Sequence, residues 1–239
     1  MPRAFKSMSE ITAYLRVVEG RLNELEKQRT NPLVFSYLAL RTTIGVLGMA
    51  LPFVVSLGAL IVFGTGLQSS ISAYYHTGTR DVFVGTLWVI GFFLFSYKGY
   101  ERVDDIAGNL ACLFAVGVAI FPTAADKATD PTLLAISILH SVFAGLFFVT
   151  LIYFCLALFT KTNPRAKPTP QKIQRNQVYR ACGYAMILCL VLMTAFTVLP
   201  RESTSVFQFY HPVFWLEALA IFAFGVSWFT KGEAILKDE

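Results

Sequence analysis

The amino-acid sequence predicts an all-α membrane protein, a bundle of six transmembrane helices preceded by a cytoplasmic amphipathic helix. Of its 239 residues, 55% are hydrophobic and only 15% are charged, whereas a soluble globular domain carries about 25% charged residues. The apolar residues also fall in continuous runs, and a run of about 20 residues is long enough to cross the hydrocarbon core as a helix. The composition therefore excludes an ordinary soluble globule.

Six apolar runs are long enough to count as predicted membrane spans. They cover residues 43–64, 81–97, 106–123, 132–159, 181–199 and 212–230. The second run is the shortest, and the fourth is so long that a tilted helix is expected. The first 30 residues are polar and lack the apolar core of a cleavable signal peptide. The chain is therefore divided into residues 1–32 and a transmembrane domain of residues 33–239.

The basic residues predict the orientation of the chain in the bilayer. Seventeen of the 20 Lys and Arg residues fall in the two chain ends and in the connections at 98–105 and 160–180, and three fall on the other side. Because cytoplasmic loops are enriched in Lys and Arg, both termini are predicted to be cytoplasmic, in the cell membrane or an inner membrane. The net charge of +5 needs no nucleic acid as partner, since the basic residues lie where anionic lipid headgroups would meet them on the cytoplasmic side.

The N-terminal segment is expected to form one helix that ends near Asn31 and Pro32. Ser7 and Glu10 have the spacing of a capping box at its start. The apolar residues of this segment recur at intervals of four and three, as Ile11, Leu15, Val18, Leu22 and Leu25. This spacing is the seam of a short coiled coil. Two interpretations stay open: a helix that lies on the inner leaflet or against the bundle, and self-association into a homo-oligomer.

Polar residues that suit a functional site gather on the side opposite to most of the basic residues. The segment SISAYYHTGTRD, residues 70–81, is the first connection on that side and holds a chemistry that a simple connector does not need. Its candidate residues are Ser72, Tyr75, His76, Arg80 and Asp81.

Three more candidates are expected at the same level from other helices. His140 lies about eight residues into the fourth run, which is roughly 12 Å at 1.5 Å per residue. His211 precedes the sixth run, and Glu217 lies within its first two turns. Charged side chains inside a span are rare and usually face the bundle interior. The sequence therefore predicts an outward-facing polar pocket, whose ligand-binding residues are Ser72, Tyr75, Arg80, Asp81 and Glu217.

The three histidines, His76, His140 and His211, are the candidate metal ligands. Three protein ligands with one open position can hold a zinc ion that activates water, so zinc is the cofactor considered. The same groups also suit a proton relay or a site for a cationic headgroup. Two structural roles compete with these: His76 belongs to the interfacial aromatic belt, and Asp81 caps its helix.

The pentapeptide Ser72-Ala-Tyr-Tyr-His76 resembles the Ser-x-x-Tyr-His motif of the hemolysin III and adiponectin-receptor-like proteins, relatives of the alkaline ceramidases. In that superfamily the histidine of the motif, an aspartate and a late His-x-x-x-His build an intramembrane zinc hydrolase site. The resemblance covers five residues, and six spans are predicted here in place of seven. Trp215 also stands four residues after His211, where the pattern has its second histidine. The chain is therefore not assigned to that family.

Three functions remain as hypotheses from the sequence. The first is a receptor-like or transporter-like protein whose outward-facing pocket binds a metal ion, a lipid headgroup or a small polar solute. The second is a metal-dependent membrane hydrolase that acts on lipid, so whether the chain is an enzyme stays open. The third is an oligomeric channel or membrane effector that assembles through its N-terminal helix.

Overall fold

The computed structural model describes residues 12, 14, 16, 18–20, 32–99, 101–125, 129–162, 167–199, 207, 209–233 and 235, and its regular elements within these residues are all helices. The chain divides into two compact units, Met1–Leu40 and Arg41–Glu239. Most of the predicted N-terminal helix, including Ile11, Leu15, Leu22 and Leu25, lies outside the described residues. The amphipathic helix and the division at residue 32 therefore stay predictions.

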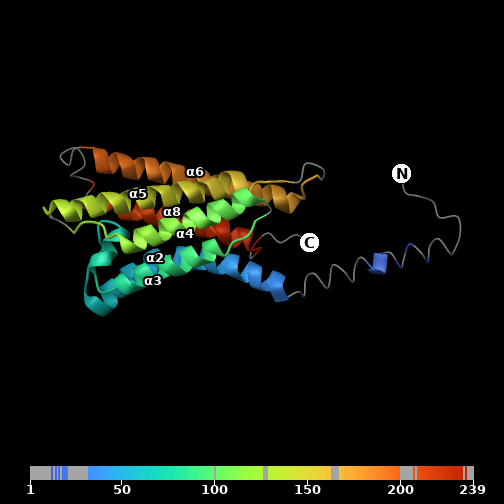
Figure 1. The fold of residues 1–239 in the computed structure, drawn as a ribbon, viewed down its shortest axis with the longest axis horizontal. Helices are drawn as coiled ribbons and strands as arrows, with labels where there is room; N and C mark the ends of the chain where they lie inside the picture. Colours follow the sequence, from blue (N-terminus) through green and yellow to red (C-terminus); the bar gives the residue numbers. More distant parts are fainter. Residues whose placement is uncertain are drawn as a thin grey trace. The chain divides into compact units, whose positions relative to one another are not determined.

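Long α-helices make up most of the second unit (Figure 1). The elements are α2 (Pro32–Phe63), the 3-10 turn η1 (Ser72–His76), α3 (Arg80–Phe95), α4 (Arg102–Ile120), α5 (Pro131–Tyr153), the π-helical turn η2 (Phe154–Leu158), α6 (Pro170–Val198) and α8 (Pro212–Lys231). Proline begins α5, α6 and α8, where its missing N–H group has no intrahelical partner to lose.

Five of the helices are long and apolar enough to cross a membrane, as expected of a multipass membrane protein. These spans are Tyr37–Phe63, Arg102–Ile120, Pro131–Leu158, Pro170–Val198 and Pro212–Lys231. The predicted span at 81–97 corresponds to α3, which has 16 residues. At 1.5 Å per residue α3 is about 24 Å long, less than the roughly 30 Å of a hydrocarbon core. The prediction of an all-α fold is confirmed, with five helices that could span a membrane, and the count of six spans is not confirmed.

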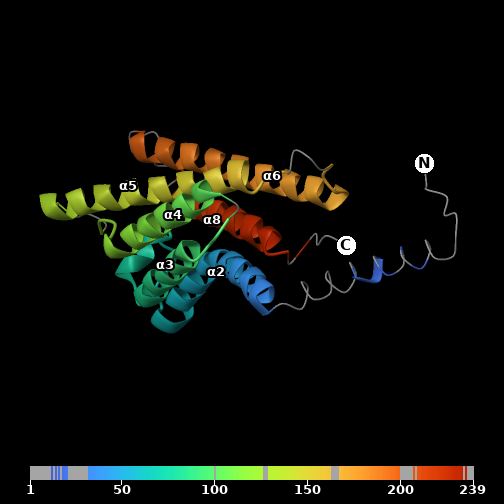
Figure 2. The ribbon, with the colours of Figure 1, turned by 45° about the vertical axis from the view of Figure 1, so that its right-hand side comes forward.

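Successive helices run in opposite directions, so their connections collect at two ends of the bundle (Figures 1 and 2). Helix α3 packs on α4, α4 on α5, α5 on α6, and α6 on α8. At one end α2, α4 and α6 finish while α3, α5 and α8 begin; we call this the His76 end. The opposite end, where η2 finishes and α6 begins, is called the Lys161 end.

Helices α2 and α8 come close enough for their backbones to touch. A Cβ atom added to Gly45 would lie 2.7 Å from the Gly225 carbonyl oxygen, and one added to Gly225 would lie 2.7 Å from that of Gly45. Glycine at both positions removes the side chains that would hold the helices apart, which is how small residues promote helix contact in membranes. The first and last spans are joined at this crossing.

Replacing Gly225 with alanine should destabilise the bundle. The new methyl group would meet backbone atoms of α2, which must move apart, and such overpacking costs about 1–3 kcal/mol. The thermal unfolding midpoint of the purified chain in detergent measures this loss. Gly145→Ala is the matched control, since a Cβ atom at Gly145 meets nothing within 4 Å. Equal midpoints for the two variants would contradict the close crossing.

Candidate functional site

The connection between α2 and α3 folds back onto the start of α8 instead of extending away from the bundle. The Glu217 carboxylate, on α8, accepts a hydrogen bond from the backbone amide of Ile71. The backbone amide of Ser72 also donates to this carboxylate. The backbone amide of Phe214 donates to the carbonyl oxygen of Ser69 at 3.1 Å. Glu217 thereby fixes the beginning of η1 on α8.

Two side chains of the same connection enter the core at the His76 end. Tyr74 is fully buried, and its ring centroid lies 6.2 Å from that of Phe214. Burial raises the pKa of Tyr74, although a hydrogen bond from the backbone of Gln68 acts in the opposite direction. The buried hydroxyl of Thr79 donates to the carbonyl oxygen of Val55 at 3.2 Å. Ile71, Tyr74 and Thr79 of this polar segment are therefore buried, whereas the other residues between 70 and 81 are partly or fully exposed.

Two of the three histidines hold the segment that follows α4. His76 Nε2 lies 2.7 Å from the carbonyl oxygen of Thr123, and His140 Nδ1 lies 2.6 Å from that of Phe121. A carbonyl oxygen only accepts, so in each ring the nitrogen concerned carries the proton. The other nitrogen of each ring keeps its lone pair. These contacts describe a loop anchor built by η1 and α5.

The other predicted site residues lie in separate surroundings. His211 precedes α8 in the left-handed conformation, with φ of 49°. Arg80 donates to the Tyr75 hydroxyl at 2.7 Å, and its guanidinium carbon lies 4.3 Å from the centroid of that ring. Asp81 is exposed in the first turn of α3. Within the described residues, no group of three or more His, Cys, Asp or Glu side chains is placed to hold a metal ion. The zinc site stays a prediction.

A group of cationic side chains occupies the Lys161 end. We call Arg41 of α2, Lys172 and Arg175 of α6, and Lys231 of α8 the basic cluster. Arg41, Lys172 and Arg175 each act on the Lys231 ammonium group by charge repulsion. Arg175 is 8% exposed. Arg41 Nη1 lies 3.5 Å from the carbonyl oxygen of Lys231. Three helices thus bring four basic side chains to one place.

Aromatic rings form the inner wall of the basic cluster. The Lys231 ammonium nitrogen lies 5.3 Å from the centroid of the Phe159 ring, and the Arg41 guanidinium carbon lies 5.4 Å from that of Tyr97. The ring of Trp228 is fully buried between these two, with its centroid 5.2 Å from each. The faces of aromatic rings attract cations and so lower the cost of holding them away from water.

The π-helical turn η2 places Phe159 at this wall. The backbone amide of Phe159 donates to the carbonyl oxygen of Phe154 at 2.8 Å, which closes the wide turn. The carbonyl oxygen of Phe159 then accepts from Lys172 Nζ at 2.9 Å. Single π-helical turns interrupt α-helices mostly at functional sites. Here the turn supplies a ring and a carbonyl group to the basic cluster.

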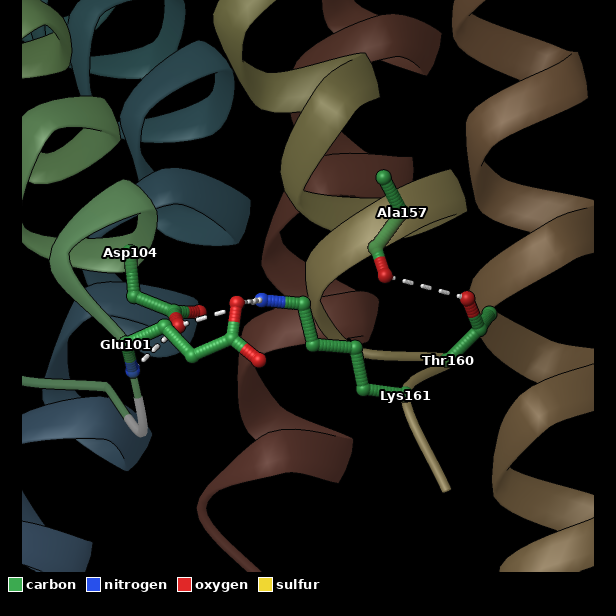
Figure 3. A network of polar contacts seen from close by, with 5 residues as sticks. All are labelled: Glu101, Asp104, Ala157, Thr160 and Lys161. Atoms are coloured by element: carbon green, nitrogen blue, oxygen red, sulfur yellow. Dashed lines mark hydrogen bonds and ion pairs between the residues drawn. The ribbon is translucent and has the colours of Figure 1, made fainter. Parts of the chain in front are cut away.

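An acidic pair, Glu101 and Asp104, lies at the start of α4 (Figure 3). Asp104 Oδ2 accepts from the backbone amide of Glu101 at 3.0 Å, and the Glu101 side chain caps the same helix start in return. Lys161 Nζ lies 3.0 Å from Glu101 Oε2 and 3.3 Å from Asp104 Oδ2. Thr160, next to Lys161, donates to the carbonyl oxygen of Ala157 and so ties this contact to η2 (Figure 3).

Electrostatics link this acidic pair to the basic cluster. Burial lowers the pKa of Lys161, but its hydrogen bond to Glu101 and the charge of Asp104 outweigh that effect and leave the pKa raised. Asp104 is 1% exposed, and its charge also attracts the Lys231 ammonium group. The buried Asp104 carboxylate therefore attracts both Lys161 and Lys231.

In the sequence, the members of the basic cluster are part of the excess of Lys and Arg on one side of the predicted spans. Two signals were present: Arg41 interrupts an apolar stretch that starts at residue 33, and Lys231 directly follows the last apolar run. A cation adjoining a span is ordinary on its own. Only the contact between Arg41 and Lys231, 190 residues apart, shows that they share a site.

Comparison with known proteins found no match to the chain among family models, curated proteins or solved structures. The geometry of the described residues is therefore the basis for the function proposed below.

Glu217→Ala should release the connection between α2 and α3 from α8. The amides of Ile71 and Ser72 lose their acceptor, and leaving such buried donors unsatisfied costs about 1–3 kcal/mol. Hydrogen–deuterium exchange at these amides should become faster. Glu217→Gln keeps an acceptor oxygen of the same shape and should change the exchange less. Unchanged exchange in Glu217→Ala would contradict the hydrogen bonds from these two amides to Glu217.

Proposed function

We propose that this chain is a multipass membrane protein that binds a phosphate-bearing anion, an anionic lipid headgroup, through the basic cluster at its Lys161 end. The observation that carries the proposal is the convergence of four cations from three helices against a buried aromatic wall. The five helices that are long and apolar enough to cross a membrane support a multipass membrane protein. The site for an anionic lipid headgroup is the part of the proposal that goes beyond membrane insertion.

Charge repulsion is the first support for an anionic ligand. Cations that lie close together disfavour one another, and burial adds a further cost because water no longer screens them. Arg41, Lys172 and Arg175 all repel Lys231, and Arg175 is buried. Asp104 offsets part of this repulsion. A phosphate group placed among these side chains would offset more of it.

The kinds of side chain favour a phosphate group at the bilayer surface. The planar guanidinium groups of Arg41 and Arg175 match two oxygens of a phosphate group at once, and lysine binds it as a point charge. The cluster lies at the ends of membrane-crossing helices, where headgroups are found, and aromatic residues are enriched at that level. A soluble phosphate compound shares this chemistry, so the experiment below separates the two sources.

The orientation belongs to the same proposal. We place the Lys161 end and both termini in the cytoplasm, because most Lys and Arg residues fall on that side. Anionic lipids are concentrated in the cytoplasmic leaflet, and each basic residue near that surface contributes about 1 kcal/mol to the attraction. The basic cluster would then face the leaflet that carries its ligand.

The outward-facing pocket stays a prediction from the sequence. Glu217, His76 and His140 contact backbone groups of neighbouring connections, which supports a structural role for them. No contact among the described residues favours hydrolysis, and the homo-oligomer also stays a prediction. A headgroup site at the Lys161 end has the stronger support.

Binding of anionic lipid should depend on the basic cluster. The full-length chain in detergent is titrated with short-chain phosphatidic acid, phosphatidylglycerol and phosphatidylcholine, and with glycerol 3-phosphate as the soluble probe. We expect the anionic lipids to bind more tightly than phosphatidylcholine. Arg175→Gln and Lys231→Gln should each weaken that binding about fivefold, which corresponds to about 1 kcal/mol per basic residue.

Arg180→Gln is the matched control for this titration, because Arg180 is an exposed arginine on the same helix. It should leave the dissociation constant unchanged. An equal loss in Arg180→Gln, or equal binding of phosphatidylcholine, would overturn the proposed site. Tight binding of glycerol 3-phosphate without the lipid chains would identify a soluble ligand. Should Arg175→Gln fail to fold, Lys231→Gln supplies the same comparison.

The orientation is tested by labelling intact cells with a membrane-impermeant maleimide. Thr129→Cys, at the His76 end, should be labelled in intact cells, whereas Lys167→Cys, at the Lys161 end, should be labelled only after lysis. Both positions are exposed. The reverse pattern would place the basic cluster at the outer leaflet.

A further inference from the structure

Two side chains of α6 hold the end of η2 through contacts to consecutive carbonyl groups. Lys172 Nζ donates to the carbonyl oxygen of Phe159 at 2.9 Å, and Asn176 Nδ2 donates to that of Thr160 at 3.4 Å. Lys172 and Asn176 are four residues apart, so their side chains lie on the same face of α6. Because Lys172 belongs to the basic cluster, Asn176 borders the candidate headgroup site.

The other polar atom of the Asn176 amide, Oδ1, is buried and has no hydrogen-bond partner among the described residues. The orientation of the amide follows from the contact with Thr160, because a carbonyl oxygen only accepts and therefore requires Nδ2 on its side. Buried polar atoms are rarely left unpaired in proteins, and each exception calls for an explanation. A hydrogen-bond donor on a ligand would supply the missing partner.

We propose that Asn176 recognises a hydroxyl group of the lipid headgroup, so that the site prefers a hydroxylated phosphodiester such as the glycerol headgroup of phosphatidylglycerol. The inference rests on the proposed function, since it assigns a second contact to the same ligand. Lys172 contacts a phosphate oxygen as a point charge, and Asn176 Oδ1 accepts a hydrogen bond from a headgroup hydroxyl. Asn176 is therefore a residue that determines specificity.

The spacing and depth of the two side chains suit such a headgroup. Residues four apart on a helix have Cβ atoms about 5–6 Å apart, and a few bonds join the phosphate of a glycerol headgroup to its hydroxyl groups. Asn176 precedes the apolar run at 181–199, which places it at the level of the headgroups. The residue is partly exposed, so a headgroup can approach its side chain.

The hydroxyl contact can be separated from charge by a matched pair of lipids. Phosphatidylpropanol is a phosphodiester with the same charge as phosphatidylglycerol and nearly the same size, but its headgroup has no hydroxyl group. A site that is built to hydrogen-bond a hydroxyl group rejects the analogue that lacks it, because the polar group of the site is then left unpaired. The ratio of the two dissociation constants therefore reports the contact with Asn176 Oδ1.

The test titrates the full-length chain in detergent with short-chain phosphatidylglycerol and phosphatidylpropanol. The natural chain should bind phosphatidylglycerol about three- to tenfold more tightly, as expected for one hydrogen bond between neutral groups. Asn176→Val removes the acceptor and should bind the two lipids equally. This variant also loses the contact with Thr160, but that loss affects both lipids alike and leaves their ratio unchanged.

Gln177→Val is the matched control, because Gln177 is an exposed amide next to Asn176 on the same helix. It should keep the preference for phosphatidylglycerol, and an equal loss of that preference in this control would overturn the inference. The unfolding midpoint shows whether Asn176→Val is folded. Should it fail to fold, the natural chain still decides, since equal binding of the two lipids to it would contradict the hydroxyl contact.

The outcomes also distinguish this inference from the proposed function. A natural chain that binds phosphatidylglycerol more tightly than phosphatidylcholine, but no more tightly than phosphatidylpropanol, would overturn the inference and leave the proposed function standing. A natural chain that binds neither anionic lipid better than phosphatidylcholine would overturn both. A preference for phosphatidylglycerol that persists in Asn176→Val would show that another residue contacts the hydroxyl group, and it would also overturn the inference.

Discussion

Carboxylates and basic side chains lie partly or fully out of contact with water at the ends of the helices. The need to compensate these groups is the constraint on which the rest of this structure depends. A carboxylate held partly or fully away from water must find donors within the chain. Glu217 finds them in the amides of Ile71 and Ser72 at the start of η1, and Asp104 finds one in the amide of Glu101 at the start of α4. The first amides of a helix have no intrahelical partner, so each carboxylate satisfies donors that would otherwise be unsatisfied. The two contacts also fix how the connections meet the helices.

The two ends of the bundle use charge differently. At the His76 end the polar groups hold connections in place: histidines contact carbonyl oxygens, and Arg80 lies on the ring of Tyr75. At the Lys161 end the same kind of local contact, between Lys161 and Asp104, lies next to cations that repel one another. This difference is why the Lys161 end is the better candidate for ligand binding.

The fold was largely predictable from the sequence, whereas the site was not. Continuous apolar runs identify helices directly, and the length of a run indicates whether it can span the membrane, so only the short α3 fell outside the expected count. The polar segment at 70–81 was expected to provide ligands, because hydroxyl, imidazole and carboxylate groups are the usual ones. The structure uses several of these groups to bind backbone, which a sequence cannot reveal. The basic cluster depends on the contact of α2 with α8 through Gly45 and Gly225, and no local pattern encodes that contact.

The π-helical turn η2 provides an independent physical reason to regard the Lys161 end as functional. An α-helix advances about 100° per residue, so the extra residue of a π-helical turn rotates everything that follows by about that angle. Without the turn, Phe159 would face a different direction, and neither its ring beside Lys231 nor its carbonyl group beside Lys172 would be in place. The wide turn has poorer packing along its axis than a regular helix. Its presence at the one point where α5 meets the basic cluster is explained if the position of Phe159 matters more than the regularity of the helix.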